Sequence, residues 1–175
     1  GALQLNGTAR GAVRDLDVKG HVQAENVEFA LGTTDVSMDS MTGDAEYSPD
    51  GGVAISDSTI RRGSAVLHAE GSLVPHREVS KRGVASYVWD SGMAVNASVE
   101  LADGAVADVL QIAGQQGVPV TGTIELNAHV TGTLDNMSGG GHVSLTGGVA
   151  YGEPYDSAGA DLVAQGRDIE ANNVV

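Results

Sequence analysis

Apolar and polar residues alternate along much of the chain. In the clearest stretch, residues 120–132, apolar or small residues occupy every second position, and Thr, Glu, Asn or His stands between them. Strict alternation is typical of a β-strand with one apolar and one solvated face. The same period appears in residues 64–74 and 93–101 and in the pair Val53 and Ile55. We therefore predict several strands that share one aliphatic face.

Turn signals separate these runs. Residues 48–52, Ser-Pro-Asp-Gly-Gly, form a strong hairpin signal, and residues 61–63, Arg-Arg-Gly, form a weaker one. Polar breaks lie at residues 15–17 and 135–136, and the basic segment 75–91 is expected to be a loop that leads into a strand at 84–89. The sequence thus predicts a mostly all-β protein in which antiparallel strands follow one another.

One segment has a helical period. Within residues 104–115, apolar side chains recur at spacings of three and four, which predicts a short amphipathic helix. Asp103 is the expected N-cap, and Gly117 followed by Pro119 is the expected stop. We expect this helix to cover part of the apolar surface of the sheet.

A phrase of the sequence occurs twice. GAVRDLDVKGHV at residues 11–22 matches GTLDNMSGGGHV at residues 132–143, which aligns Val13 with Leu134. The match extends upstream to Leu3, which aligns with Ile124 at the same offset of 121 residues. This offset exceeds the 20–50 residues of common solenoid repeats, so each unit is a multi-strand block. We expect one continuous segment over residues 1–175, with blocks at 1–74 and 120–175 joined by residues 75–119.

Composition narrows the partners. The formal net charge is −14, which argues against nucleic acid because binding there depends on cations that neutralise phosphates. The chain has no cysteine, one Trp and one Phe, so the inward side chains are mostly aliphatic. No apolar run is long enough to cross a membrane. Both ends fall within alternating or unfinished patterns, from which we expect a segment of a longer polypeptide.

No catalytic or metal-binding constellation appears. The five histidines lack the H-x-x-x-H and H-E-x-x-H spacings, and the serines lack a G-x-S-x-G motif. Gly139, Gly140 and Gly141 are not followed by the Lys and Ser or Thr of a phosphate loop. We therefore expect a non-enzymatic protein without a metal ion or other cofactor.

Two architectures could bury the aliphatic face. Either two sheets close over a common core, as in a structural or adhesive repeat of a cell-surface protein, or one sheet curls into an open trough that suits acyl chains. A carbohydrate-active β-protein is a third hypothesis, although the scarcity of aromatic side chains leaves few platforms for sugar stacking.

The second half of the chain resembles a known family. The motifs are Val120-Thr121-Gly122, then residues 130–134 (VTGTL), 141–145 (GHVSL) and 151–155 (YGEPY), all downstream of the helical segment. In this order they resemble the AsmA-like superfamily, most closely its TamB-like branch of translocation and assembly modules (DUF490-type). The chain departs from the family at Met137, where proline is common, which weakens a turn signal.

The resemblance has implications for fold and function. It implies a long antiparallel sheet curled into a taco-shaped groove, in the periplasm of a diderm bacterium, with an inner-membrane anchor outside this segment. Implied partners are phospholipid acyl chains, carried between the inner and outer membranes, and an outer-membrane barrel protein whose assembly the family supports. The expected lining of the groove is Leu3, Leu5, Val53, Ile55, Leu67, Leu73, Val95, Val99, Ile124, Leu126, Val130, Leu134, Val143 and Leu145.

Overall fold

A computed structural model describes residues 1–175 except 13–14, 32–33, 81–82, 84, 116 and 167. It contains twelve strands and one helix, in the order β1 (Ala2–Arg10), β2 (Asp17–Leu31), β3 (Thr34–Ser48), β4 (Gly52–Arg62), β5 (Ala65–Val74), β6 (His76–Val79), β7 (Ala85–Val88), β8 (Ala94–Ala105), α1 (Val106–Ile112), β9 (Thr123–Thr133), β10 (Asn136–Ala150), β11 (Glu153–Gly166) and β12 (Asp168–Asn172).

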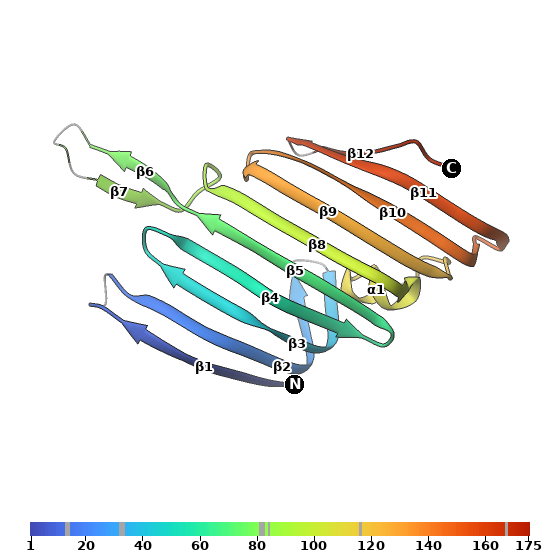
Figure 1. Cartoon of the computed structure of the whole chain (residues 1–175), viewed down its shortest axis with the longest axis horizontal. Helices are drawn as coiled ribbons and strands as arrows, with labels where there is room; N and C mark the ends of the chain where they lie inside the picture. The colour runs from blue at the N-terminus through green and yellow to red at the C-terminus, as the bar shows by residue number, and fades with distance from the viewer. Residues whose placement is uncertain (13–14, 32–33, 81–82, 84, 116, 167) are drawn as a thin grey trace.

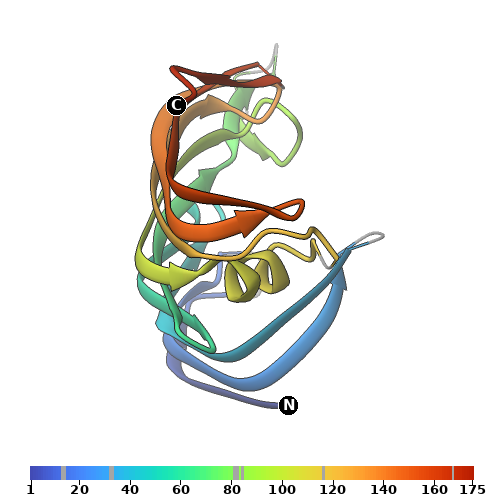
Figure 2. The same ribbon diagram turned by 90° about the vertical axis from the view of Figure 1, so that its right-hand side faces the viewer.

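Ten of the strands form one antiparallel sheet (Figure 1). Its order is β1-β2-β3-β4-β5-β8-β9-β10-β11-β12, so neighbours in the sheet follow one another along the chain and β1 and β12 are the two edges. Figure 2 shows that the sheet is curved and that α1 lies inside the curve. The predicted fold class, an antiparallel and mostly β protein with one short helix, is confirmed.

The turns lie where proline and glycine signalled them. β3 ends at Ser48 and β4 begins at Gly52, and the Gly51 amide donates a hydrogen bond to Ser48 Oγ over 2.9 Å. The second signal lies at the end of β4, where Gly63 has a φ of +53°. Short connections of this kind leave successive strands antiparallel, which explains the simple order of the sheet.

The helix differs from its predicted form. It spans Val106–Ile112 instead of 104–115, and its N-cap is Ala105, without a side-chain cap. Asp103 lies inside β8 at a φ of +51°, next to an irregularity in the pairing between Leu101 and Gly104, so its assignment as N-cap was wrong. The chain leaves the helix through Gly114 at a φ of +66°, before the predicted stop at Gly117.

The basic segment contains more structure than the predicted loop. β6 and β7 pair antiparallel in a separate two-stranded sheet that projects beyond the large one in Figure 1. After β7, the ring of Trp89 lies 6.0 Å from that of Tyr47 on β3, measured between centroids. This aromatic contact joins the base of the hairpin to the large sheet.

The repeated phrase also repeats in strand pairing. Leu5 pairs with Val22 between β1 and β2, and Leu126 pairs with Val143 between β9 and β10, so both partners differ by the same 121 residues. Gly11 and Gly132, which the offset aligns, have φ values of +114° and +118°. The aligned position Val13 lies outside the described residues. The two blocks therefore share their register over the first two strands.

Candidate apolar trough

One face of the large sheet is aliphatic from strand to strand. Side chains of directly paired residues point to the same side of a sheet, so a cross-strand row shows what that side carries. The longest such row crosses nine strands from β1 to β11 without a polar residue, and we call the side that it marks the apolar face. The row consists of Leu3, Ala24, Met41, Ile60, Leu67, Leu101, Leu126, Val143 and Ala160.

Backbone irregularities keep this row in phase. Ile55 and Ile60 are five residues apart, a spacing that would place them on opposite sides of a regular strand. The pairing of β4 with β5 shifts between Ile55 and Ser58, and Asp57 has a φ of +49°. This bulge inserts an extra residue and returns Ile60 to the apolar face. Ser58 is buried there, and its hydroxyl donates a hydrogen bond to the Ala69 carbonyl.

The helix covers one end of the apolar face. Among the described residues, the buried hydrophobic side chains are Ala24, Met38, Ala65, Leu101 and Val106. Leu101 is 2% exposed and Ala65 is fully buried, and α1 contacts the neighbouring β3, β4 and β8. This covered end has the packing of an ordinary protein core.

Polar contacts fix the helix to the turn between β4 and β5. The Ser64 amide donates to Asp108 Oδ2 over 2.8 Å, and Arg62 Nε donates to Gln111 Oε1 over 2.8 Å. Arg62 also pairs with Asp39 on β3. The Gly63 amide, which donates to Asp39, and the Arg62 guanidinium lower the pKa of the Asp39 carboxyl below its ordinary value. These bonds hold the helix over one end of the apolar face.

Beyond the helix the apolar face is open. A hollow of about 350 Å³ extends over β5, β8, β9, β10, β11 and β12. We call this hollow the apolar trough. Its volume is near the lower end of the roughly 300–1,000 Å³ that is typical of ligand pockets. The side chains that line it from the apolar face are Ala69, Ala97, Val99, Ala128, Val130, Leu162, Ala164 and Ile169.

The trough also borders residues whose side chains belong to the other side of the sheet. Glu70, Ser98, His129 and Gly140 lie beside it. Glu70 pairs with Ser98, and His129 pairs with Gly140, one position away from the aliphatic pairs. The side chains of Glu70, Ser98 and His129 therefore point to the opposite face, and Gly140 has none. The lining residues that belong to the apolar face therefore have only hydrocarbon side chains.

All predicted lining residues except Leu134 lie in strands of the large sheet and on the apolar face. Val99 and Val130 line the trough. Leu134 instead lies in the turn between β9 and β10, where its amide donates to the Met93 carbonyl. Sequence reasoning missed Leu162, Ala164 and Ile169. Alternation of Ala158, Ala160, Leu162 and Ala164 along β11 could have revealed the first two, whereas Ile169 is in the short β12.

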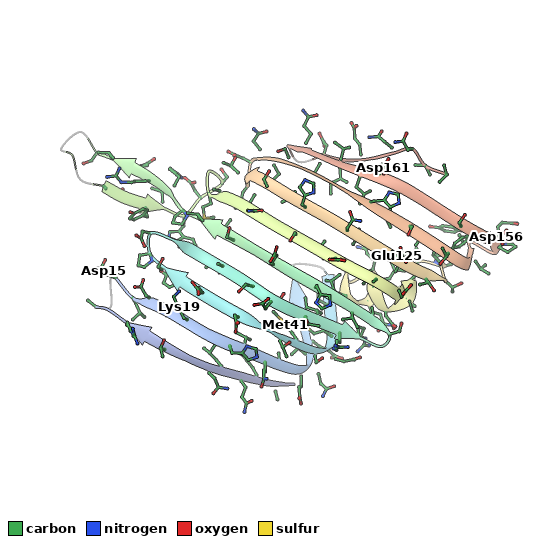
Figure 3. The ribbon with its side chains drawn as sticks, in the orientation of Figure 1. Asp15, Lys19, Met41, Glu125, Asp156 and Asp161 are labelled. Atoms are coloured by element: carbon green, nitrogen blue, oxygen red, sulfur yellow. The ribbon has the colours of Figure 1, made fainter. Side chains whose placement is uncertain are left out.

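The opposite face is polar and carries the histidines of the repeated phrase. His21 Nδ1 lies 2.8 Å from Asp44 Oδ1 on the next strand, and His142 Nδ1 lies 2.8 Å from Asp161 Oδ1. Figure 3 labels Lys19, Glu125 and Asp161, which come from β2, β9 and β11. Hydrogen bonds from Asn173 and His142 lower the pKa of Asp161. The pairs thus stabilise the polar face across neighbouring strands.

Within the described part of the chain, no group of three or more His, Cys, Asp or Glu side chains is placed to hold a metal ion. No helix among the described residues is long and apolar enough to span a membrane. No protein-family model, curated protein or solved structure matches the chain. The resemblance to the AsmA-like superfamily therefore stays a prediction from the sequence.

Proposed function

We propose that the apolar trough holds phospholipid acyl chains and that the protein carries them without catalysing a reaction. The observation that supports this proposal most is the open aliphatic face itself. Ile169 is 74% exposed beside the trough, and Leu3 is 75% exposed at the other edge. Removing apolar surface from water is favourable by roughly 25 cal/mol of free energy per Å², so such a face favours an apolar occupant.

The chemistry of the lining favours hydrocarbon over a polar ligand. Ligand sites for polar molecules usually contain a few placed hydrogen-bonding groups that fix orientation. Here the apolar face supplies alanine, valine, leucine and isoleucine, and the hydroxyl of Ser58 is already bonded to the Ala69 carbonyl. An acyl chain needs no such groups, and an occupant held only by apolar contacts can shift along the face.

The dimensions of the sheet agree with this occupant. Ten strands that lie about 4.8 Å apart extend over roughly 43 Å from edge to edge. An acyl chain crosses about half of the ~30 Å hydrocarbon core of a bilayer. The apolar face is therefore longer than one chain, even where α1 covers part of it. The acidic polar face keeps charge on the other side of the sheet.

The wider role depends on the family resemblance of the sequence. Under that resemblance the protein acts in the periplasm and transfers phospholipid between the inner and outer membranes, or supports assembly of outer-membrane proteins. The alternative, a structural or adhesive repeat with a closed core, has less support, because a closed core would bury the apolar face on both sides of α1. Among the described residues of the apolar face, Ile169 remains largely exposed.

Photocrosslinking tests the proposal. A benzophenone amino acid at Val130 should capture phospholipid from mixed vesicles, and the same residue at Thr131, the next position on the polar face, should capture little. Circular dichroism establishes that both variants keep their strands. Equal capture at the two positions, or none at Val130, would contradict the proposal.

A second experiment places a negative charge in the trough. Val130→Glu should lower the amount of phospholipid that is extracted with the purified protein severalfold, because a carboxylate in an apolar site is costly to desolvate. Thr131→Glu is the matched control and should leave the amount unchanged. The same loss in both variants would show that charge anywhere on β9 matters and would contradict a trough at Val130.

A further inference from the structure

A separate cavity lies at the end of the large sheet where β2 begins and β3 ends, next to the small hairpin (Figure 1). Its volume is about 500 Å³, within the roughly 300–1,000 Å³ that is typical of ligand pockets. Carboxylates and aromatic rings line it, and we call it the aromatic–acid cavity. Its lining residues are Asp15, Asp17, Pro49, Asp50, Tyr87 and Trp89. None of these residues lines the apolar trough.

The aromatic side chains of the protein concentrate at this cavity. Tyr87 and Trp89 line it, and Tyr47 packs beside Trp89 with 6.0 Å between the ring centroids and an angle of 31° between the ring planes. The chain has only six aromatic residues, so half of them are gathered here. Tyr87 and Trp89 are each 42% exposed, which shows that they are not packed into a closed core. Exposed rings gathered in one place are typical of a binding surface.

Three carboxylates share the cavity with these rings. Asp17 is the first residue of β2, Asp15 precedes it by two positions, and Asp50 lies in the turn between β3 and β4. Asp44 and Asp161 of the polar face are bonded to histidines on neighbouring strands. The three aspartates of the cavity have no such side-chain partner among the described residues, so their charges are directed to solvent and to an occupant.

The lining favours an organic cation over an anion or a metal ion. None of the lining residues is a lysine or arginine, although Arg10 pairs with Asp17 and Arg77 pairs with Tyr87 in the neighbouring ladders. The carboxylates therefore repel an anion. Within the described ranges, no three acidic or histidine side chains, these aspartates included, are placed to hold a metal ion. Aromatic rings bind a cation through the negative charge on their faces, which needs no coordinating oxygen.

We propose that the aromatic–acid cavity binds a small quaternary ammonium cation, with its trimethylammonium group against the rings of Tyr87 and Trp89. The three carboxylates attract the cation, and the rings select its methylated surface. A primary ammonium group is strongly hydrated and loses more on leaving water, so it suits this site less well. The cavity is separate from the apolar trough, and the proposal does not depend on the occupant of the trough.

Isothermal titration calorimetry of the intact chain with choline tests the proposal. Choline should bind saturably, and its neutral analogue, in which a tert-butyl group replaces trimethylammonium, should bind at least tenfold more weakly. Nuclear Overhauser effects should connect the methyl protons of choline to the indole of Trp89, whose resonances are unambiguous because the chain has one tryptophan. Equal affinity for the two compounds, no saturable binding, or no Overhauser effect to Trp89 would overturn the proposal.

Matched variants separate the cavity from the overall charge of the chain. Asp17→Asn combined with Asp50→Asn should weaken choline binding at least fivefold, and so should Tyr87→Leu. Glu153→Gln combined with Asp156→Asn also removes two exposed charges, but at the opposite end of the large sheet, where Figure 3 labels Asp156; it should change binding less than twofold. Circular dichroism establishes that the variants keep their strands. The same loss in both double variants would overturn a site at the cavity.

Glycerophosphocholine distinguishes a free cation from a lipid head group that contains the same trimethylammonium group. It has the phosphocholine group without acyl chains, so its binding does not involve the trough. Because the three carboxylates repel its phosphate, it should bind more weakly than choline. Tighter binding of glycerophosphocholine than of choline would overturn a free cation as the occupant.

Discussion

β1 and β9 have matching patterns but different environments. Leu5 and Leu126 are aligned by the repeat and pair with Val22 and Val143, yet Leu5 is 62% exposed while Leu126 is half-buried. β9 has β8 beside it, and β8 supplies Leu101 under α1. The difference teaches that an alternating strand specifies which side chains are apolar, while its neighbours decide how much of that apolar surface leaves water.

The largest loss of stability is expected from a substitution in β8, the strand beside β9, close to α1. Leu101→Ala should lower the free energy of unfolding by about 2–4 kcal/mol, because it empties a site that is 2% exposed and fixed between α1 and the sheet. Urea denaturation measures this loss. A change below about 1 kcal/mol would mean that the packing under α1 does not determine stability.

The matched substitutions in the two strands test the comparison directly. Leu126→Ala should cost about 1–2 kcal/mol, since its side chain is half-buried against Leu101, whereas Leu5→Ala should cost less than about 0.5 kcal/mol. Both values come from urea denaturation under one set of conditions. Equal losses would show that exposure differs without an energetic consequence.

Matched substitutions at the aligned turn glycines should destabilise the protein by the same amount in the two blocks. Gly132→Ala and Gly11→Ala should each cost about 1 kcal/mol, because both residues have φ near +115°, which an alanine adopts only with strain. The added Cβ would also meet the carbonyl oxygen of Asn136 or Asp15. Because each effect is confined to one turn, thermal unfolding should show similar losses of stability for the two variants. Clearly different losses would show that the two turns are not equivalent.

The smallest expected effect concerns the histidine–aspartate pairs. Asn173→Ala removes the largest cause that lowers the pKa of Asp161, so this pKa should rise toward its ordinary value. A lowered pKa stabilises the fold above the ordinary value and ceases to do so as pH falls through the lowered value. The variant should therefore lose less stability on acidification. Carboxyl NMR titration measures the pKa of Asp161, and an unchanged value would contradict the assignment to Asn173.

The strands and their apolar phase could be predicted because period-two alternation is a local property. The sheet order followed from short turns at residues such as Gly51 and Gly63. The bulge at Asp57 could not be predicted, because no residue there signals the inserted position that returns Ile60 to the apolar face. The start of α1 was misplaced because Asp103, a good N-cap residue, instead adopts a left-handed conformation within β8.

The sequence predicted that the sheet has an aliphatic face, but it did not predict which part of that face forms the trough. Val99 and Val130 belong to it because β10, β11 and β12 continue the sheet beyond them, while α1 covers Leu101 one alternation away. Which part of an aliphatic face stays open depends on contacts between segments far apart in the sequence. Ile169 illustrates this, since its strand of five residues has too short a pattern to indicate its partners.

The contact between Tyr47 and Trp89 makes the molecule its own optical reporter. Trp89 is the only tryptophan of the chain, and its ring centroid lies 6.0 Å from that of Tyr47. Tyrosine excitation passes efficiently to tryptophan at this separation, so the part of the emission that a Tyr47→Phe variant loses reports whether the segment after β7 stays against β3, whereas transfer from Tyr87 in β7 is common to both states. Detachment of the small hairpin can therefore be followed in unlabelled protein, separately from unfolding of the large sheet.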